Sequence, residues 1–61
     1  MIATPKPKTS IRPGDRTVLG IVTETRLSPS GKTMLITVRE PSGTLFTDRV
    51  SAYGDMYVFT V

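Results

Sequence analysis

Two copies of one turn pattern constrain the fold of this chain more than any other feature. Ser28-Pro29-Ser30-Gly31 and Glu40-Pro41-Ser42-Gly43 both have the form x-Pro-Ser-Gly. Proline presets the second position of a type I turn, and glycine supplies the left-handed residue that closes a hairpin with a bulge. Between the turns, residues 32–39 alternate Met, Ile and Val with Thr, Leu and Thr. The sequence therefore predicts two successive hairpins, which form a three-stranded meander.

The segments around the meander also have β character. Residues 16–27 are rich in β-branched side chains and predict one long strand that bends near Gly20. Residues 44–49 complete the meander, and residues 56–61 form a closing strand that pairs with the first. Residues 50–55 are too short for an α-helix and predict a single 3₁₀ turn. The expected core is Val18, Ile21, Val22, Met34, Ile36, Val38, Phe46, Val50, Met56 and Val58, with Leu19 or Leu27 under a loop.

This order of elements resembles that of the SH3-like small β-barrels. The resemblance covers residues 11–61, begins with the Pro-Gly turn of residues 12–15, and includes no motif of a particular family. It implies an all-β, five-stranded SH3-like barrel with a single 3₁₀ turn before the last strand. An OB-type barrel is less favoured, because it needs a longer chain and a true helix between its third and fourth strands.

Residues 1–10 read differently from the barrel segment at 11–61. They hold two prolines, two lysines and little to bury, so we expect a flexible basic N-terminal arm. The net charge of the chain is +3, and all of this excess lies within residues 1–16, whereas residues 17–61 are neutral.

The position of these charges suggests a nucleic-acid contact, since cations that neutralise phosphates release condensed counterions. Arg26, Lys32, Arg39 and Arg49 would extend the contact if they share a face of the barrel. Two tyrosines offer stacking or partner-binding positions. The alternative is a solubilising leader with tyrosines that complete the core. The predicted nucleic-acid-binding residues are Lys6, Lys8, Arg12, Arg16 and Lys32, and the predicted partner-binding residues are Tyr53 and Tyr57.

Catalytic and metal chemistry has little support in the composition. The chain has no cysteine or histidine, which excludes disulfides and Cys/His zinc sites. Its carboxylates are dispersed and lack a nucleophile–base pair. Ser30-Gly31-Lys32-Thr33 lacks the first glycine of a phosphate-binding loop, where Arg26 stands, and precedes a strand. We therefore predict no catalytic residue, metal or cofactor.

The function predicted is that of a small non-enzymatic binding protein whose partner is nucleic acid or a nucleic-acid-bound complex. One alternative is a modulator that docks on a larger protein, of the kind phage or plasmid genomes encode. An oligomeric enzyme with a shared central site is the less favoured alternative. Pairing of residues 56–61 would make a homo-oligomer. With no apolar run of about 20 residues, we expect no membrane contact and a cytoplasmic location.

Overall fold

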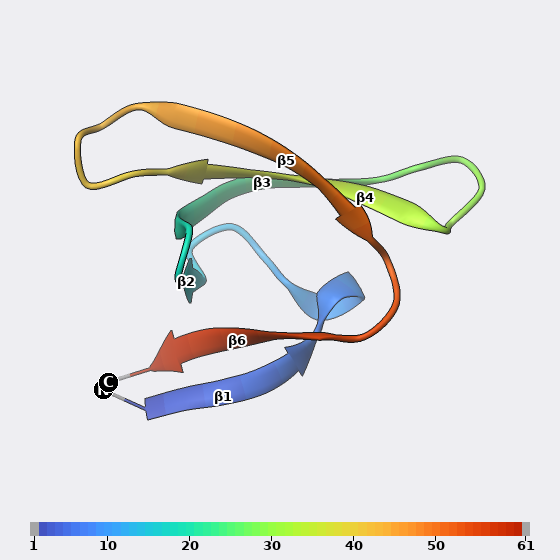
Figure 1. The fold of residues 1–61 in the computed structure, drawn as a ribbon, viewed down its shortest axis with the longest axis horizontal. Coiled ribbons are helices and arrows are strands. Elements are labelled where there is room, and N and C mark those ends of the chain that lie inside the picture. The colour runs from blue at the N-terminus through green and yellow to red at the C-terminus, as the bar shows by residue number, and fades with distance from the viewer. Residues whose placement is uncertain (1, 61) are drawn as a thin grey trace.

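A computed structural model describes residues 2–60, which form one antiparallel sheet and its connections (Figure 1). The six strands follow the order β1-β6-β2-β3-β4-β5. The prediction of an all-β fold is confirmed, but the predicted five-stranded barrel is wrong, because this sheet has six strands and is open. The elements are β1 (Ile2–Pro7), the 3₁₀ turn η1 (Lys8–Ser10), β2 (Arg16–Thr17), β3 (Gly20–Leu27), β4 (Thr33–Arg39), β5 (Leu45–Ser51) and β6 (Asp55–Thr60).

The sheet is rolled, so its inner face encloses the core. In Figure 1, β3, β4 and β5 form one layer, β6 and β1 form the other, and β2 joins them. A β-bulge in β3 between Val22 and Glu24 shifts the register against β4. Bulges bend a strand and increase its twist, which helps this sheet to curl.

Both predicted hairpin turns are confirmed. The amide of Gly31 donates a hydrogen bond to the Ser28 carbonyl at 2.9 Å, and the amide of Gly43 donates to the Glu40 carbonyl at 2.8 Å. β4 pairs along its length with β3 on one side and β5 on the other, as a meander requires. The Ser-Gly-Lys-Thr segment lies at the first hairpin and leads into β4.

The long strand predicted over residues 16–27 is divided by a chain reversal. Thr17 pairs with Gly20, so Val18 and Leu19 form a two-residue turn between β2 and β3. The buried Thr17 hydroxyl donates to the Gly20 carbonyl and accepts from the Leu19 amide. Gly20 has a φ of +142°, and a Cβ there would lie 2.5 Å from the Arg39 carbonyl oxygen. Only glycine fits this contact between β3 and β4.

The N-terminal segment differs from the predicted flexible arm, because residues 2–7 form β1 and pair with β6. Two prolines are tolerated there, since β1 is an edge strand and needs few backbone donors. The 3₁₀ turn also lies elsewhere than predicted, over residues 8–10 rather than 50–55. There the Lys8 amide donates to the Gly54 carbonyl, which fixes η1 against the β5–β6 connection. Met1 and Val61, included in the predicted arm and closing strand, lie outside the described residues.

β6 lies between β1 and β2 in the sheet, which bears on the homo-oligomer predicted to form through the C-terminal strand. Arg16 of β2 pairs with Phe59, so the closing strand contacts the first predicted strand as expected. β1 occupies the other side of β6. The edge strands of the sheet are therefore β1 and β5, and β6 is paired along one side with β1 but with β2 only at Phe59. Pairing between copies through residues 56–61 stays a prediction.

The core lies between the two layers and matches most of the predicted set. The buried apolar cluster is Ile11, Val22, Met34, Ile36, Val38 and Val58, with Leu19, Val50 and Met56 partly buried against it. Ile11, which is fully buried, was not predicted because it stands between the expected arm and the first turn. Ala52 is a second buried residue missing from the prediction.

Three residues of the predicted core are exposed instead. Val18 is at the tip of the β2–β3 turn and is 78% exposed. The turn also changes the phase of the alternation, so Ile21 points outward. Phe46 is opposite the buried Val38 but belongs to the edge strand β5, where no further strand covers it, and is 46% exposed. Of the two alternatives Leu19 and Leu27, Leu19 packs against the core, and Leu27 is exposed at the end of β3.

Candidate binding face

Strand register brings residues from five strands into one row on the outer face of the sheet. Directly opposed residues in antiparallel strands project from the same face. Arg16 is opposite both Phe59 and Ile21, and Ile21 is opposite Arg39. Arg39 is in turn opposite Leu45. The outer row is therefore Phe59, Arg16, Ile21, Arg39 and Leu45, in strand order from β6 to β5.

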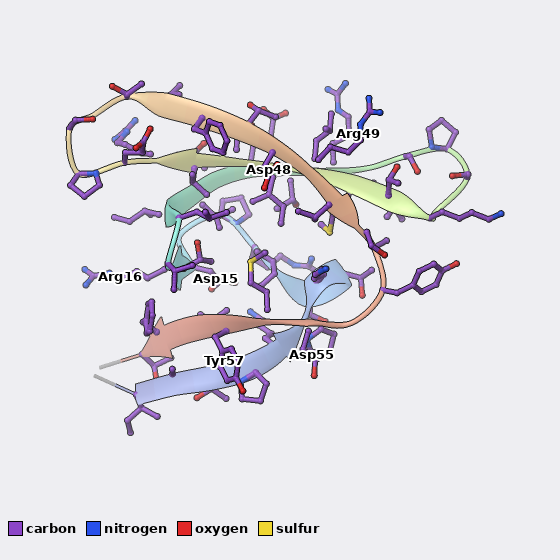
Figure 2. The ribbon with its side chains drawn as sticks, viewed as in Figure 1. Asp15, Arg16, Asp48, Arg49, Asp55 and Tyr57 are labelled. Atoms are coloured by element: carbon purple, nitrogen blue, oxygen red, sulfur yellow. The ribbon has the colours of Figure 1, made fainter. Side chains whose placement is uncertain are left out.

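A second row runs over the other end of the meander. Leu35 is opposite Arg26 in β3 and Arg49 in β5. Leu35 and Arg39 are on the same face of β4, because side chains alternate along a strand. Figure 2 shows Arg49 directed away from the β1–β6 layer, whereas its neighbour Asp48 is directed toward that layer. Four of the five arginines thus share the outer face; we call Arg16, Arg26, Arg39 and Arg49 the outer arginine face.

These guanidinium groups are available to a ligand. Within residues 2–60, the side chains of Arg16, Arg39 and Arg49 make no hydrogen bond or ion pair. Arg26 lies 4.0 Å from Glu24, and both side chains are mostly exposed, so this pair holds the arginine weakly. Glu24 also projects outward, since it is opposite Thr37. The strand positions of this face thus carry an excess of positive charge.

Lys6, one of the predicted nucleic-acid contacts, has an internal partner. Its ammonium lies 2.9 Å from Asp15 Oδ2, and the Arg12 amide donates to the same oxygen at 2.9 Å. The hydrogen bond from Lys6, followed by that from Arg12, holds the pKa of Asp15 below its usual value of 3.8. The contact joins β1 to the turn before β2, so Lys6 has a structural role.

The other predicted cations are separated. Lys8 and Lys32 are both near the β5–β6 connection, because their backbones bond to Gly54 and Ala52. The β3–β4 loop that holds Lys32 is at the opposite end of the view from β2, which carries Arg16 (Figure 1). Arg12 is exposed in the turn before β2, and its guanidinium donates to the Thr9 carbonyl at 3.4 Å. The structure does not gather the five predicted residues onto one surface.

The two predicted tyrosines lie in different surroundings. Tyr57 is 59% exposed on β6, opposite Pro5, and shares the outer face with Phe59 two residues along (Figure 2). Tyr53 is exposed in the connection between β5 and β6. Arg16 and Tyr57, which were predicted, and Phe59, which was not, lie on the outer side of the rolled sheet, but Tyr57 belongs to the layer opposite the one that carries Arg49 (Figure 2).

A groove of about 530 Å³ lies over the outer row. It is bounded by the start of β3, the end of β4, the β4–β5 loop and the end of β6. Sequence reasoning missed this groove, because it depends on the β2–β3 reversal that brings Ile21 outward. The side chains that matter for binding are Arg16, Ile21, Arg39, Glu40, Pro41 and Phe59.

Other site types and known proteins add nothing to this picture. Over residues 2–60, no three or more carboxylates gather in a way that would hold a metal ion. The same part of the chain has no helix with the length and apolar character needed to cross a bilayer. No protein-family model, curated protein or solved structure matches the chain. The arrangement of the outer face is suited to binding an anionic partner by contact.

Proposed function

We propose that this protein is a small non-enzymatic nucleic-acid-binding protein whose outer arginine face contacts the phosphate backbone. The observation that carries the proposal is the shared face of Arg16, Arg26, Arg39 and Arg49, with apolar side chains between them. A guanidinium presents a planar fork of donors that matches phosphate oxygens. The proposal moves the contact from the N-terminal segment to the sheet, since Lys6 is paired with Asp15.

The spacing of the two rows suits an extended ligand. Arg39 and Leu35 are four residues apart on β4, which corresponds to about 13 Å along the strand. A backbone that runs along the meander therefore meets Arg39 near one end and the Arg26–Arg49 pair near the other. Exposed sheet faces with cations and aromatic side chains serve as platforms for nucleic acid in several small folds.

The SH3-like interpretation enters the proposal in modified form. The strand order β6-β2-β3-β4-β5 is that of a meander whose closing strand returns to the first strand. β1 is then an added strand beside β6. The strand order and the Arg16–Phe59 pairing support this interpretation.

Salt dependence tests the proposal. If four arginines replace counterions, the binding constant falls with salt with a log–log slope of about −2.8 for single strands and −3.6 for a duplex. Affinity for a labelled oligonucleotide, measured by fluorescence anisotropy, then drops by about 50-fold to 150-fold between 50 and 200 mM salt. Binding that is absent at low salt contradicts the proposal.

Two double variants of equal charge locate the contact. Arg26→Gln with Arg49→Gln removes two charges from the outer arginine face, whereas Lys8→Gln with Lys32→Gln removes two charges near the β5–β6 connection. The arginine variant should lower the magnitude of the salt slope by about 1.4 to 1.8 and weaken binding at least tenfold. The lysine variant should keep the wild-type slope. The opposite pattern would place the contact near the β5–β6 connection instead.

A second candidate function is docking on a larger protein. Several large apolar side chains are exposed away from the outer row, and Val18 is the most exposed of them at 78%. Apolar side chains gathered on a surface are typical of protein interfaces. A chain that binds no oligonucleotide at low salt but copurifies with a protein through Val18 would favour this second function.

A further inference from the structure

The groove over the outer row has the side chains that an unpaired nucleobase needs. Phe59, Ile21 and Pro41 provide apolar surface from β6, β3 and the β4–β5 loop. Arg16 and Arg39 flank Ile21 on the neighbouring strands, each about 4.8 Å away across the sheet. The apolar lining is complementary to a flat ring. The two guanidinium groups are complementary to an anionic group on each side of that ring.

We propose that this groove holds one unpaired base of a single-stranded nucleic acid, with the adjoining phosphates on Arg16 and Arg39. This inference rests on the proposed nucleic-acid-binding function. The volume of about 530 Å³ is within the range of about 300–1,000 Å³ typical of small-ligand sites. A duplex hides its base faces within the stack, so its bases have no access to Phe59.

Charge within the groove orients the ligand. Glu40, the carboxylate in the lining, precedes the β4–β5 loop, whereas Arg16 lies on the opposite side of Ile21 from Arg39. A phosphate is repelled by Glu40, and a base carries donor groups that a carboxylate accepts. The base therefore lies over Ile21, between the two guanidinium groups that hold the adjoining phosphates, and no phosphate lies beside Glu40.

Tyr57 extends the site by one nucleotide. It lies two residues from Phe59 on the same face of β6, about 6.6 Å along the strand, and its ring is exposed. Aromatic side chains bind bases by stacking without regard to sequence. The base next to the one in the groove stacks on Tyr57, so Phe59 and Tyr57 together favour a single strand.

The test compares one mixed sequence as a single strand and as a duplex, in DNA and in RNA, by fluorescence anisotropy at one salt concentration. Phe59→Leu should weaken single-strand binding about tenfold and leave duplex binding and the salt slope unchanged. Phe46→Leu is the matched control, because Phe46 is also partly exposed but faces inward, and it should bind as the wild type does. The DNA and RNA arms show which sugar the site accepts.

Two further variants distinguish a loss of binding from a loss of folding. Phe59→Tyr keeps the ring and should retain wild-type binding, and Arg39→Gln should weaken single-strand binding without changing the thermal midpoint. Equal affinity for single strand and duplex, with no effect of Phe59→Leu, overturns this inference and leaves the proposed function in place. Failure of every nucleic acid to bind overturns both.

Discussion

The side chains on the inner face of β4 form part of the core, whereas those on its outer face lie at the surface. Met34, Ile36 and Val38 point inward and are almost fully buried, whereas Leu35 and Arg39 point outward. The inner face is continuous apolar surface, and the outer face places arginine between aliphatic side chains. Half of a strand's residues are thus enough for the core. The other half of this strand supplies Leu35 and Arg39 to the proposed binding face.

The same contrast extends over the neighbouring strands. Ile21 and Leu45 are exposed on either side of Arg39, and Arg16 follows Ile21. Single exposed apolar residues are ordinary on protein surfaces. Here they alternate with arginines, and this alternation is the basis of the proposed binding face.

The largest expected effect is a difference in the free energy of unfolding between substitutions on the inner face and on the outer face of β4. Ile36→Ala creates a cavity in the core and should lower the free energy of unfolding by about 2–5 kcal/mol. Leu35→Ala, one residue away and facing outward, should cost less than about 1 kcal/mol. Urea denaturation of both variants measures the difference. Equal losses would mean that the assignment of faces is wrong.

The next largest effect concerns the close contact between Gly20, at the start of β3, and the carbonyl of Arg39, at the end of β4. Gly20→Ala would force a Cβ to within 2.5 Å of the Arg39 carbonyl at a positive φ, so it should cost about 2 kcal/mol or more. Gly14→Ala is the control, since its φ is +97° but nothing lies within 4 Å of its Cβ position. The control should cost about 1 kcal/mol. Thermal melts that show equal losses would exclude the close contact.

The smallest effect concerns the link between the two layers. The pKa of Asp15 is lowered by Lys6 and Arg12, so its stabilising effect is present above its ordinary value of 3.8 and is lost as pH falls through the lowered pKa. Asp15→Asn should therefore cost about 0.5–1 kcal/mol at pH 6 and less at pH 3, where the carboxylate of the native protein begins to be protonated. Urea denaturation at both pH values measures this difference. A loss that does not depend on pH would contradict the ion pair.

The sequence predicted the meander better than the segments around it. Alternation and Pro-Ser-Gly turns are local signals, so residues 28–43 were predicted correctly. The pairing of residues 2–7 with β6 joins distant parts of the chain, and no local sequence pattern predicts it. Proline and lysine in that segment suggested an unstructured arm, whereas an edge strand accommodates both.

The candidate site was predicted only in part. The condition that Arg26, Lys32, Arg39 and Arg49 share a face is met by the three arginines, whereas Lys32 lies apart from them in the first hairpin loop. Phe59 and the groove could not be anticipated, because they depend on the β2–β3 reversal and on the position of β6. The excess of positive charge within residues 1–16 directed attention to Lys6, whose charge is paired with Asp15.

A methyl-detected NMR titration with a single-stranded oligonucleotide distinguishes the two faces in one experiment. Nucleic-acid binding by the outer face predicts that the methyl signals of Ile21 and Leu35 shift with ligand, whereas those of Ile36 and Val38 stay in place. The shifts should shrink as salt increases. Shifts confined to residues near Lys8 and Lys32, or no shifts at low salt, would contradict a nucleic-acid site on the outer face.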